Sequence, residues 1–320
     1  MALKEISVII PNYNGENLLK ENLPLVVSAT NFFNLGGGCS EIIVVDDASE
    51  DNSISVLKKF KNIKIVKHTS NKGYAEAVYS GVISAKYRYV FLLNSDVKIP
   101  ENIFEELLKP FTNQDTFASS PVITNINGRI SSGSYKVPFI KRGELKFEKW
   151  KHLKFKKEEM LNTLFCSGGS ALIDKDKFLS LKGFHPIYKP FYYEDTDICV
   201  RAWKKGWQSY FVPSVSVIHH HQSTIKKFHK NFYIKTIMRR NRFFLLWSNL
   251  PFKFLLFNHI PNVLPRIVSY SIKFDFSYLS GLICAILNLK STYLKRKNEP
   301  QTFFEIIDLI NKDFRRIKPD

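Results

Sequence analysis

The chain has 320 residues, of which 44% are hydrophobic and 24% charged, so it can bury a sizeable core and is not a disordered protein. Lys and Arg outnumber Asp and Glu by 47 to 29, a formal net charge of +18 that favours an anionic partner such as nucleic acid, an acidic membrane face or a phosphate-bearing substrate. The four cysteines include no CxxC pair, which argues against a zinc cluster or a disulfide framework and favours reduced thiols.

The N-terminus enters an apolar run at once, without the basic leader and long apolar core of a signal peptide. No uninterrupted apolar stretch reaches about 18 residues, the usual minimum for a membrane-spanning helix. The nearest are Phe243–Leu264, which is broken by two prolines and a lysine, and Phe276–Leu289, which is too short. We therefore expect a cytoplasmic protein.

Short apolar runs alternate with helical patterns through the first hundred residues. The runs are Ile6–Ile10, Glu41–Val45, Ile63–Val66 and Tyr89–Leu93, and the helical patterns are Asn17–Val27, Ser53–Phe60 and Tyr74–Ala85. Such alternation predicts βαβ units and an α/β fold with a mostly parallel central sheet flanked by helices. Ligands bind beyond the carboxyl ends of such strands, where this chain has four polar turns. These turns are Pro11–Gly15, Asp46–Ser49, His68–Gly73 and Asn94–Asp96.

Four segments combine the end of a strand or the start of a helix with acidic or amide side chains. They are Ser7–Gly15, Val44–Ser49, Phe91–Asp96 and Phe191–Asp197, the last opening a helix that continues through Ile198–Gly206. Together with Gly168–Ala171, their order and spacing resemble those of the family 2 inverting glycosyltransferases, and most of all the bacterial rhamnosyltransferase-like branch. The resemblance covers residues 5–224 and extends loosely to Leu250.

This resemblance implies a GT-A fold, two abutting Rossmann-like halves, over residues 1–224. The nucleotide-binding half would span about residues 1–100 and the acceptor half about residues 101–224. The implied activity is transfer of a hexosyl or deoxyhexosyl group, with inversion, from a nucleotide-diphosphate sugar to a glycan or a lipid-linked oligosaccharide acceptor. The implied process is the synthesis of bacterial cell-surface polysaccharide.

Inverting transfer needs one carboxylate to take the proton of the attacking hydroxyl and a group that neutralises the departing diphosphate. The resemblance places the catalytic acid in the pair Glu194 and Asp195; we take Asp195 as the base and Glu194 as the alternative. A helix N-terminus at this point would keep Asp195 ionised. We expect Asp197 to pair instead with Arg201, four residues further along the helix.

Asp96 resembles the last acid of the family's Asp-x-Asp metal motif, although the first position of that motif is Asn94 in this chain. Hard oxygen ligands and a diphosphate indicate Mg²⁺ or Mn²⁺ rather than zinc. One histidine of the triplet at residues 219–221 would assist the metal or the diphosphate, and the resemblance favours His219. On a strand, His219 and His221 would share one face and His220 the other.

The resemblance also assigns side chains to the two substrates. The donor-binding residues would be Pro11, Tyr13, Asp46, Asp47, Lys72, Gly73, Asn94, Ser95 and Asp96. The acceptor-binding residues would be Gly168, Gly169 and Tyr193. Asp47 has an alternative role, because residues of its type often hold their own loop, here through Ser49. Trp203 and Trp207 are expected to pack in the core rather than to bind sugar.

Two segments are strongly basic. Ile140–Lys157 contains eight Lys and Arg residues, which predicts a solvated connection or, alternatively, a loop that folds over an anionic substrate. Residues 225–320 interleave aromatic and aliphatic residues with Lys and Arg, as in Met238–Trp247. They predict a helical extension that suits either ordinary packing or docking at the anionic inner face of the cell membrane.

Three other functions compete with this interpretation. A nucleic-acid-binding protein would also be basic, but no helix-turn-helix, zinc finger or RNA-binding signature is visible, so we expect no nucleic acid partner. A nucleotidyltransferase would have a glycine-rich phosphate turn near the N-terminus, where this chain has Pro11–Gly15. An inactive family member that serves as a scaffold is the third alternative, and Asn94 favours it slightly.

Overall fold

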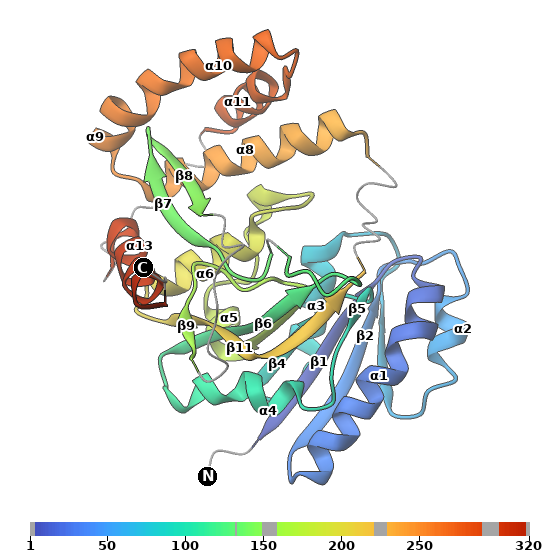
Figure 1. Cartoon of the computed structure of the whole chain (residues 1–320). Coiled ribbons are helices and arrows are strands. Elements are labelled where there is room, and N and C mark those ends of the chain that lie inside the picture. Colours follow the sequence, from blue (N-terminus) through green and yellow to red (C-terminus); the bar gives the residue numbers. More distant parts are fainter. Residues whose placement is uncertain (1–3, 132, 149–158, 221–228, 290–300, 318–320) are drawn as a thin grey trace.

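The computed structural model describes residues 4–131, 133–148, 159–220, 229–289 and 301–317. A nine-stranded sheet crosses the molecule, with the strand order β3-β2-β1-β4-β10-β6-β11-β5 and with β9 paired to β11 (Figure 1). Its strands are β1 Glu5–Asn12, β2 Cys39–Asp46, β3 Ile63–Lys67, β4 Tyr89–Leu93, β5 Val97–Lys98, β6 Thr116–Thr124, β9 Leu161–Asn162, β10 Ser170–Asp174 and β11 Gln208–His219.

The first half of the sheet is parallel. β1 pairs with β2 and with β4, and β2 pairs with β3, all in parallel. Both faces of β1 are buried, since Ile6 and Val8 contribute to one hydrophobic cluster and Ile9 to the other. A continuous apolar run is the pattern of a strand covered on both sides. The four predicted strands are therefore confirmed, and their polar carboxyl ends lie along one edge of the sheet.

The second half of the sheet is mixed. β10 is antiparallel to both of its neighbours, β4 and β6, whereas β11 runs parallel to β6. β5 and β9 pair with β11 in the antiparallel sense. Because β10 lies between β4 and β6 and runs antiparallel to them, its start lies beside the end of β4, where Ser170 pairs with Leu93. The residues just before β10 thus lie next to the polar end of β4.

Helices cover both faces of the sheet. One face packs against α1, α2 and α4, and the other against α3, α5 and α6. The bounds are α1 Glu16–Leu35, α2 Ser53–Leu57, α3 Tyr74–Ser84, α4 Ile103–Leu108, α5 Lys175–Ser180 and α6 Glu194–Trp203. The predicted three-layer α/β architecture is confirmed, although α1 continues eight residues beyond the predicted end at Val27.

The C-terminal residues form helices that pack against a hairpin and against α6 (Figure 1). The helices are α8 Asn231–Asn249, α9 Phe252–Phe254, η3 Leu255–His259, η4 Ile260–Asn262, α10 Val263–Ile272, α11 Ser277–Leu287 and α13 Phe303–Ile317; the hairpin is β7 Val137–Lys141 and β8 Glu144–Glu148. Its tip contacts the C-terminal helices, because His259 Nδ1 lies 2.7 Å from the Gly143 carbonyl oxygen and Arg266 donates to that of Arg142.

This hairpin corrects one prediction. The first part of the basic segment Ile140–Lys157 is a β-hairpin with buried Glu144 and Leu145, not a solvated connection. Glu144 forms ion pairs with Arg242 and Arg266, so part of the positive charge is neutralised within the molecule. Lys149, Lys151, Lys154, Lys156 and Lys157 lie outside the described residues, as do His221, Ser223 and Thr224.

The four cysteines are free thiols, and two of them, Cys166 and Cys199, are buried side by side. None of the helices in the described ranges has the length and apolar character that crossing a bilayer requires.

Candidate active site

The ends of β1 and β2 form one wall of the candidate site. Asn12 pairs with Asp46 in the register of the two strands, and its side-chain amide donates to the Asp46 carboxylate over 3.0 Å. The same amide reaches Ser49, whose hydroxyl accepts from the backbone of Asn14. Of the predicted base and ribose contacts, Pro11 lies near the end of β1 and Tyr13 in the turn that these bonds shape, and both are half-buried.

Asp47 organises the neighbouring loop rather than its own. Its carboxylate accepts from the backbone N–H groups of Lys72 and Gly73, over 2.9 and 2.7 Å, and its Oδ1 lies 2.6 Å from His68 Nδ1. Asp46, not Asp47, accepts from the backbone of Ser49. Gly73 has a φ of +86°, a conformation that favours glycine, and leads into α3. Lys72 is thereby held at the surface beside the strand ends.

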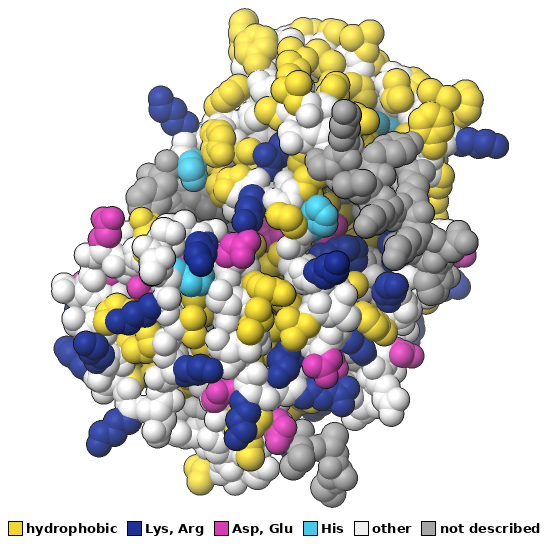
Figure 2. Space-filling view, turned by 180° about the vertical axis from the view of Figure 1, so that it is seen from behind, with side chains coloured by type: hydrophobic (Ala, Val, Ile, Leu, Met, Phe, Trp, Pro, Cys, Tyr) yellow, Lys and Arg dark blue, Asp and Glu magenta, His cyan; other side chains and the backbone are white. Residues whose placement is uncertain are grey.

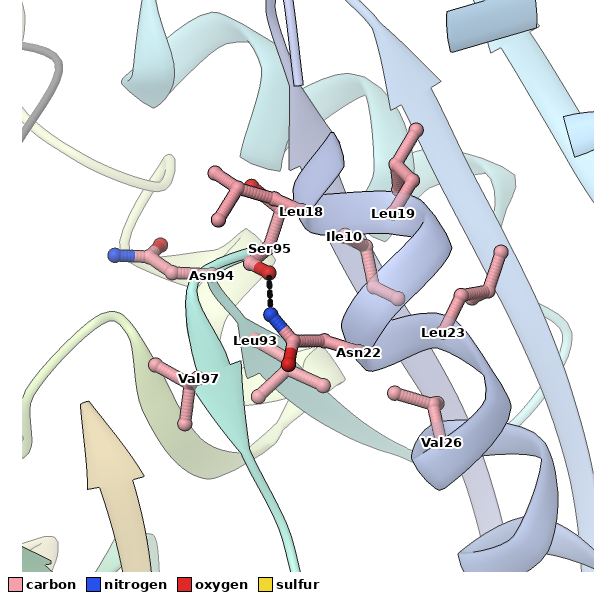
Figure 3. A pocket seen from close by; sticks show the side chains of 10 residues that line it. All are labelled: Ile10, Leu18, Leu19, Asn22, Leu23, Val26, Leu93, Asn94, Ser95 and Val97. Carbon is pink, nitrogen blue, oxygen red and sulfur yellow. Dashed lines mark hydrogen bonds between the residues drawn. The ribbon is translucent and has the colours of Figure 1, made fainter. Parts of the chain in front are cut away.

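Asn94, Ser95 and Asp96 lie beyond the end of β4, beneath the start of α1. Figure 3 shows Asn22 of α1 donating to the Ser95 carbonyl oxygen, over 2.8 Å, while the Asn94 side chain points away from Asn22. The backbone N–H of Asn94 donates to Gly169, next to β10. A Cβ at position 169 would lie 2.8 Å from the Asn94 side-chain amide, so a larger residue there would force that amide to move.

Asp96 and His219 meet across the sheet edge. His219 ends β11 opposite Val97, and its Nε2 lies 3.1 Å from the Asp96 carboxylate. In the described part of the chain no group of three His, Cys, Asp or Glu side chains has the geometry of a metal site. The Asp96 carboxylate still fits Mg²⁺ or Mn²⁺, because such ions take as few as one or two protein carboxylates and fill their remaining positions with phosphate oxygens and water. The His219 imidazole would add a nitrogen ligand beside it.

The Gly168–Gly169 turn links the β4 edge to the acidic pair. The Tyr74 hydroxyl donates to the Gly168 carbonyl oxygen over 2.7 Å, and a Cβ at position 168 would lie 2.6 Å from that hydroxyl. The Gly168 backbone also hydrogen-bonds to Asp195. Burial, and then the charges of Glu194 and Asp195, raise the pKa of Tyr74 well above its usual value. Tyr74, Gly168 and the two carboxyl groups therefore form one cluster, in which Gly168 is buried and the three side chains are half-buried.

Glu194 and Asp195 open α6, as predicted. The Asp195 carboxylate accepts from the backbone N–H of Thr196 over 2.7 Å. Burial raises the pKa of Asp195, and the nearby Lys136 ammonium opposes this shift. Burial, followed by the charge of Asp195, raises the pKa of Glu194 to about 8. The backbone N–H of Thr196, at the start of the helix, also opposes the shift, as the predicted effect of a helix N-terminus would, but burial is the largest single effect on the pKa of Asp195.

Stability should depend on pH through Glu194. A carboxyl group whose pKa is raised by folding stabilises the protein fully below its unfolded-state pKa and loses that contribution as the pH rises through the folded-state pKa. The window therefore runs from 4.5 to about 8. We expect the unfolding temperature to fall across this window, and Glu194→Gln to reduce that fall by at least roughly 3 °C. Thermal unfolding scans at several pH values measure both.

Glu148→Gln, at an exposed position of β8, provides the matched control for this prediction. An identical pH dependence in wild type and Glu194→Gln would show that Glu194 ionises normally in the folded protein.

The loop before the acidic pair is strained and is held by α8. Tyr192 and Tyr193 have φ values of +71° and +75°, in the left-handed region that bulky residues avoid. The buried Asn241 side chain of α8 donates to three carbonyl oxygens of this loop, those of Tyr188, Phe191 and Tyr192, over 2.8–3.0 Å. The orientation of Glu194 and Asp195 thus depends on a helix of the C-terminal extension.

Asp197 and Trp203 have the structural roles predicted for them. Arg201 Nε donates to Asp197 over 2.7 Å, and the Tyr188 hydroxyl donates to the same carboxylate. Trp203 is fully buried and donates to the Thr163 carbonyl oxygen. Tyr193, a predicted acceptor contact, is half-buried and packs against the clusters that α8 and α13 share with α6.

Sequence reasoning missed Lys136 and Asn241. The Lys136 ammonium lies 4.2 Å from the centroid of the Phe165 ring and acts electrostatically on Asp195. Burial lowers the pKa of Lys136. Neither residue belongs to a recognisable motif, and each approaches the acidic pair from a distant part of the sequence.

Residues 7–181 match the sequence model of the family described as glycosyl transferase family 2. Poly(ribitol-phosphate) beta-glucosyltransferase of Bacillus spizizenii is 36% identical over 97 residues, 29% of this chain and 15% of that protein. Poly(ribitol-phosphate) beta-N-acetylglucosaminyltransferase TarP of Staphylococcus aureus is 32% identical over 109 residues, 33% of this chain and 32% of that protein. The matched part of this chain thus spans about a third or less of either relative.

Solved structures confirm the GT-A-like fold. The structure of GalNAc-T7 with UDP, GalNAc and Mn²⁺ has a TM-score of 0.63 at 18% identity and covers 92% of this chain and 58% of that one. That of S. aureus TarS residues 1–349 with UDP-GlcNAc has a TM-score of 0.53 at 14% identity and covers 98% and 82% of the two chains. At these identities the likeness concerns the fold alone.

Proposed function

The chain belongs to glycosyl transferase family 2, and from this premise we propose that it transfers a hexosyl or deoxyhexosyl group, with inversion, from a nucleoside-diphosphate sugar to a hydroxyl of a glycan or lipid-linked acceptor. Relatives named for teichoic acid and polysaccharide synthesis favour a role in building cell-surface polymers. A lipid-linked acceptor would place the protein at the inner face of the cell membrane. The rhamnosyltransferase-like branch stays a prediction, which a deoxyhexose donor would test.

One observation carries this proposal: four separate parts of the chain converge at the carboxyl edge of the sheet. They are the end of β4 with Asp96, the end of β11 with His219, the Gly168–Gly169 turn and the Glu194–Asp195 start of α6. Glu194 and Asp195 are half-buried, Asp46 and Asp47 are buried at the end of β2, and Lys72 is exposed at the same edge. This arrangement would provide a base, a diphosphate site and a nucleotide site side by side.

Asp195 would act as the base. Its carboxylate takes the proton of the acceptor hydroxyl as the new oxygen–carbon bond forms at the anomeric carbon and the bond to the diphosphate oxygen breaks on the opposite face. Lys136 favours the ionised form of Asp195, and Glu194, with a pKa of about 8, stays protonated at neutral pH. In this proposal Asp195 carries the negative charge of the pair and Glu194 is the neutral partner.

Asp96 and His219 would hold the divalent cation. When bound, the cation neutralises the charge of the leaving diphosphate. Asn94 fits the edge of this site as a neutral contact, because its backbone and side chain already lie against Gly169. Lys72 would add a positive charge at the phosphates, while Pro11, Tyr13 and Asp46 would surround the base and ribose.

Nucleotide binding tests the donor site. We expect one of UDP-, GDP-, dTDP- or CMP-sugars to raise the unfolding temperature in the presence of Mn²⁺ or Mg²⁺ and to be hydrolysed slowly. Asp96→Ala should weaken this binding at least about tenfold, because it removes one of the two protein ligands of the cation. Thermal shift and calorimetric titration measure the effect.

Asp176→Ala, at an exposed position of α5, is the matched control. Equal metal-dependent binding by the wild type and Asp96→Ala would contradict the assignment of Asp96. No response of the folded wild type to any nucleotide would favour the scaffold alternative, and turnover of a nucleoside triphosphate with a sugar phosphate would favour a nucleotidyltransferase.

A further inference from the structure

Exposed apolar side chains concentrate on the outer helices of the C-terminal extension. In the described ranges, 13 of the 24 exposed large hydrophobic side chains lie between residues 252 and 289. Figure 2 shows hydrophobic side chains gathered over the end of the molecule that α9, α10 and α11 form. Soluble proteins rarely expose apolar patches of this kind without a partner.

This concentration is not where the sequence pattern placed it. The segment Met238–Trp247, which motivated the prediction of membrane docking, lies in α8, and its residues Phe243–Leu246 are buried in the clusters shared with α6 and α11. Most of the exposed apolar side chains follow the end of α8 at Asn249, although Met238 of this segment is itself 40% exposed. If the protein docks at a membrane, the exposed side chains of α9, α10 and α11 are therefore better placed to do so than those of Met238–Trp247.

α10 is apolar on both of its sides. Its inner side chains, Val263, Ile267 and Tyr270, pack against the cluster formed by α8 and α11. On the outer side, Leu264 is 68%, Val268 51% and Ile272 73% exposed, and Ile260 of the preceding η4, 55% exposed, continues the same spacing of four. A helix with apolar side chains on its outer side as well as its inner side is normally covered by protein or by lipid on both. We call these four residues, with Phe257 and Phe274, the outer apolar face.

Two partners could cover the outer apolar face, a second copy of the chain or a lipid bilayer, and the charges around the face favour the bilayer. Its flanking charged residues, Lys253 and Lys273, are exposed and basic, and the one acid of residues 252–289, Asp275, is ion-paired with Arg239 over 2.8 Å. A second copy of the chain would bring another net charge of +18 to the contact. An anionic bilayer instead attracts Lys residues at its surface while its acyl boundary takes up the apolar side chains.

We propose that the outer apolar face docks on an anionic lipid bilayer, with α10 lying in the plane of the headgroup region. The described helices are too short and too polar to cross the bilayer, so α10 would lie along it. Lys253 and Lys273 would contact the lipid headgroups, and Leu264 and Ile272 would enter the acyl boundary. This proposal does not depend on which sugar the protein transfers.

Vesicle binding by the full chain tests the proposal without any substrate. The probes are vesicles of phosphatidylcholine alone and of an equimolar mixture of phosphatidylcholine and phosphatidylglycerol. Wild type should sediment with the mixed vesicles, and less so as the salt concentration rises. The double variant Leu264→Glu/Ile272→Glu should lose at least about tenfold in affinity, because two apolar side chains no longer enter the lipid.

The matched control is Leu35→Glu/Ile83→Glu, which changes two equally exposed apolar residues in the N-terminal half, at 89% and 60% exposure. It should bind as the wild type does, and circular dichroism should show all three proteins folded. The proposal is overturned if the wild type ignores both kinds of vesicle, or if both double variants lose affinity alike. Self-association of the wild type that only the tail variant abolishes, without vesicle binding, would overturn it in favour of a second copy.

Discussion

Asp195→Asn should abolish sugar transfer, lowering turnover by about a hundredfold to ten-thousandfold, while the affinity for the nucleotide sugar changes little. The substitution keeps the shape of the side chain and its place in the hydrogen bonds to Thr196 and Gly168, but the amide cannot accept the proton of the attacking hydroxyl. Single-turnover transfer assays measure the loss, and nucleotide titration of the same variant measures the affinity.

Two companion variants make this result specific. Asp176→Asn, on the exposed side of α5, should retain wild-type turnover. Glu194→Gln should retain more turnover than Asp195→Asn, because we propose Asp195 as the base and because burial raises the pKa of Glu194 to about 8. If Glu194→Gln instead showed the larger loss, Glu194 would be the base. Full activity of Asp195→Asn would exclude the acidic pair from proton transfer altogether.

Asn241→Leu should lower turnover roughly tenfold to a hundredfold although residue 241 touches no substrate in our proposal. Its amide nitrogen lies 2.8–3.0 Å from three carbonyl oxygens of the strained loop that precedes Glu194, and its two N–H groups are shared among them. Without these bonds the loop can relax from the left-handed conformations of Tyr192 and Tyr193, and the carboxylates turn away from the anomeric carbon. We also expect a loss of about 1–3 kcal/mol in the free energy of unfolding, as for other unsatisfied buried groups.

A purely structural role for Asn241 would not separate turnover from donor binding. Assays well below the unfolding temperature should show a lower kcat with an unchanged nucleotide affinity. The Asn241 amide holds the loop before Glu194, whereas the nucleotide would bind at the turns after β1 and β2. Asn249→Leu removes only a bond to Leu245 within the same helix and should leave kcat unaltered. If Asn241→Leu is folded at the assay temperature and keeps its kcat, the loop does not need this support.

The sequence predicted the parts of this fold that local patterns control. Continuous apolar runs identified the strands β1, β2, β3 and β4, and the polar residue that ends each of them identified one edge of the sheet. The acidic pair at the start of α6 was found because it belongs to a motif with a recognisable order and spacing. For the same reason Asp96 and His219, 123 residues apart, could be expected in one place, where the structure brings them together.

Other features depend on contacts that no local pattern records. Asn241 acts on carbonyl oxygens about 50 residues earlier in the chain, and any residue type has a carbonyl oxygen. Lys136 lies close to a stretch where basic residues are common, so nothing in the sequence distinguished it as the one that would lie near Asp195. The raised pKa of Glu194 follows from desolvation, which only the packed structure determines. The basic composition of Ile140–Lys157 hid the hairpin, because the alternation of β8 is short and carries charged residues.

The hairpin β7–β8 limits how this protein can be recombined with its relatives. Gly143 at its tip has a φ of +73°, and a Cβ there would lie 2.2 Å from the Asn258 carbonyl oxygen, so the tip and the chain near η3 fit only as a pair. The other end of the hairpin contacts α13, where Asn311 donates to the Pro138 carbonyl oxygen. A chimera that joins another catalytic half to these C-terminal helices would therefore have to carry residues 137–148 with them. A junction placed at the end of β11 would separate surfaces shaped for each other and leave both halves with exposed core.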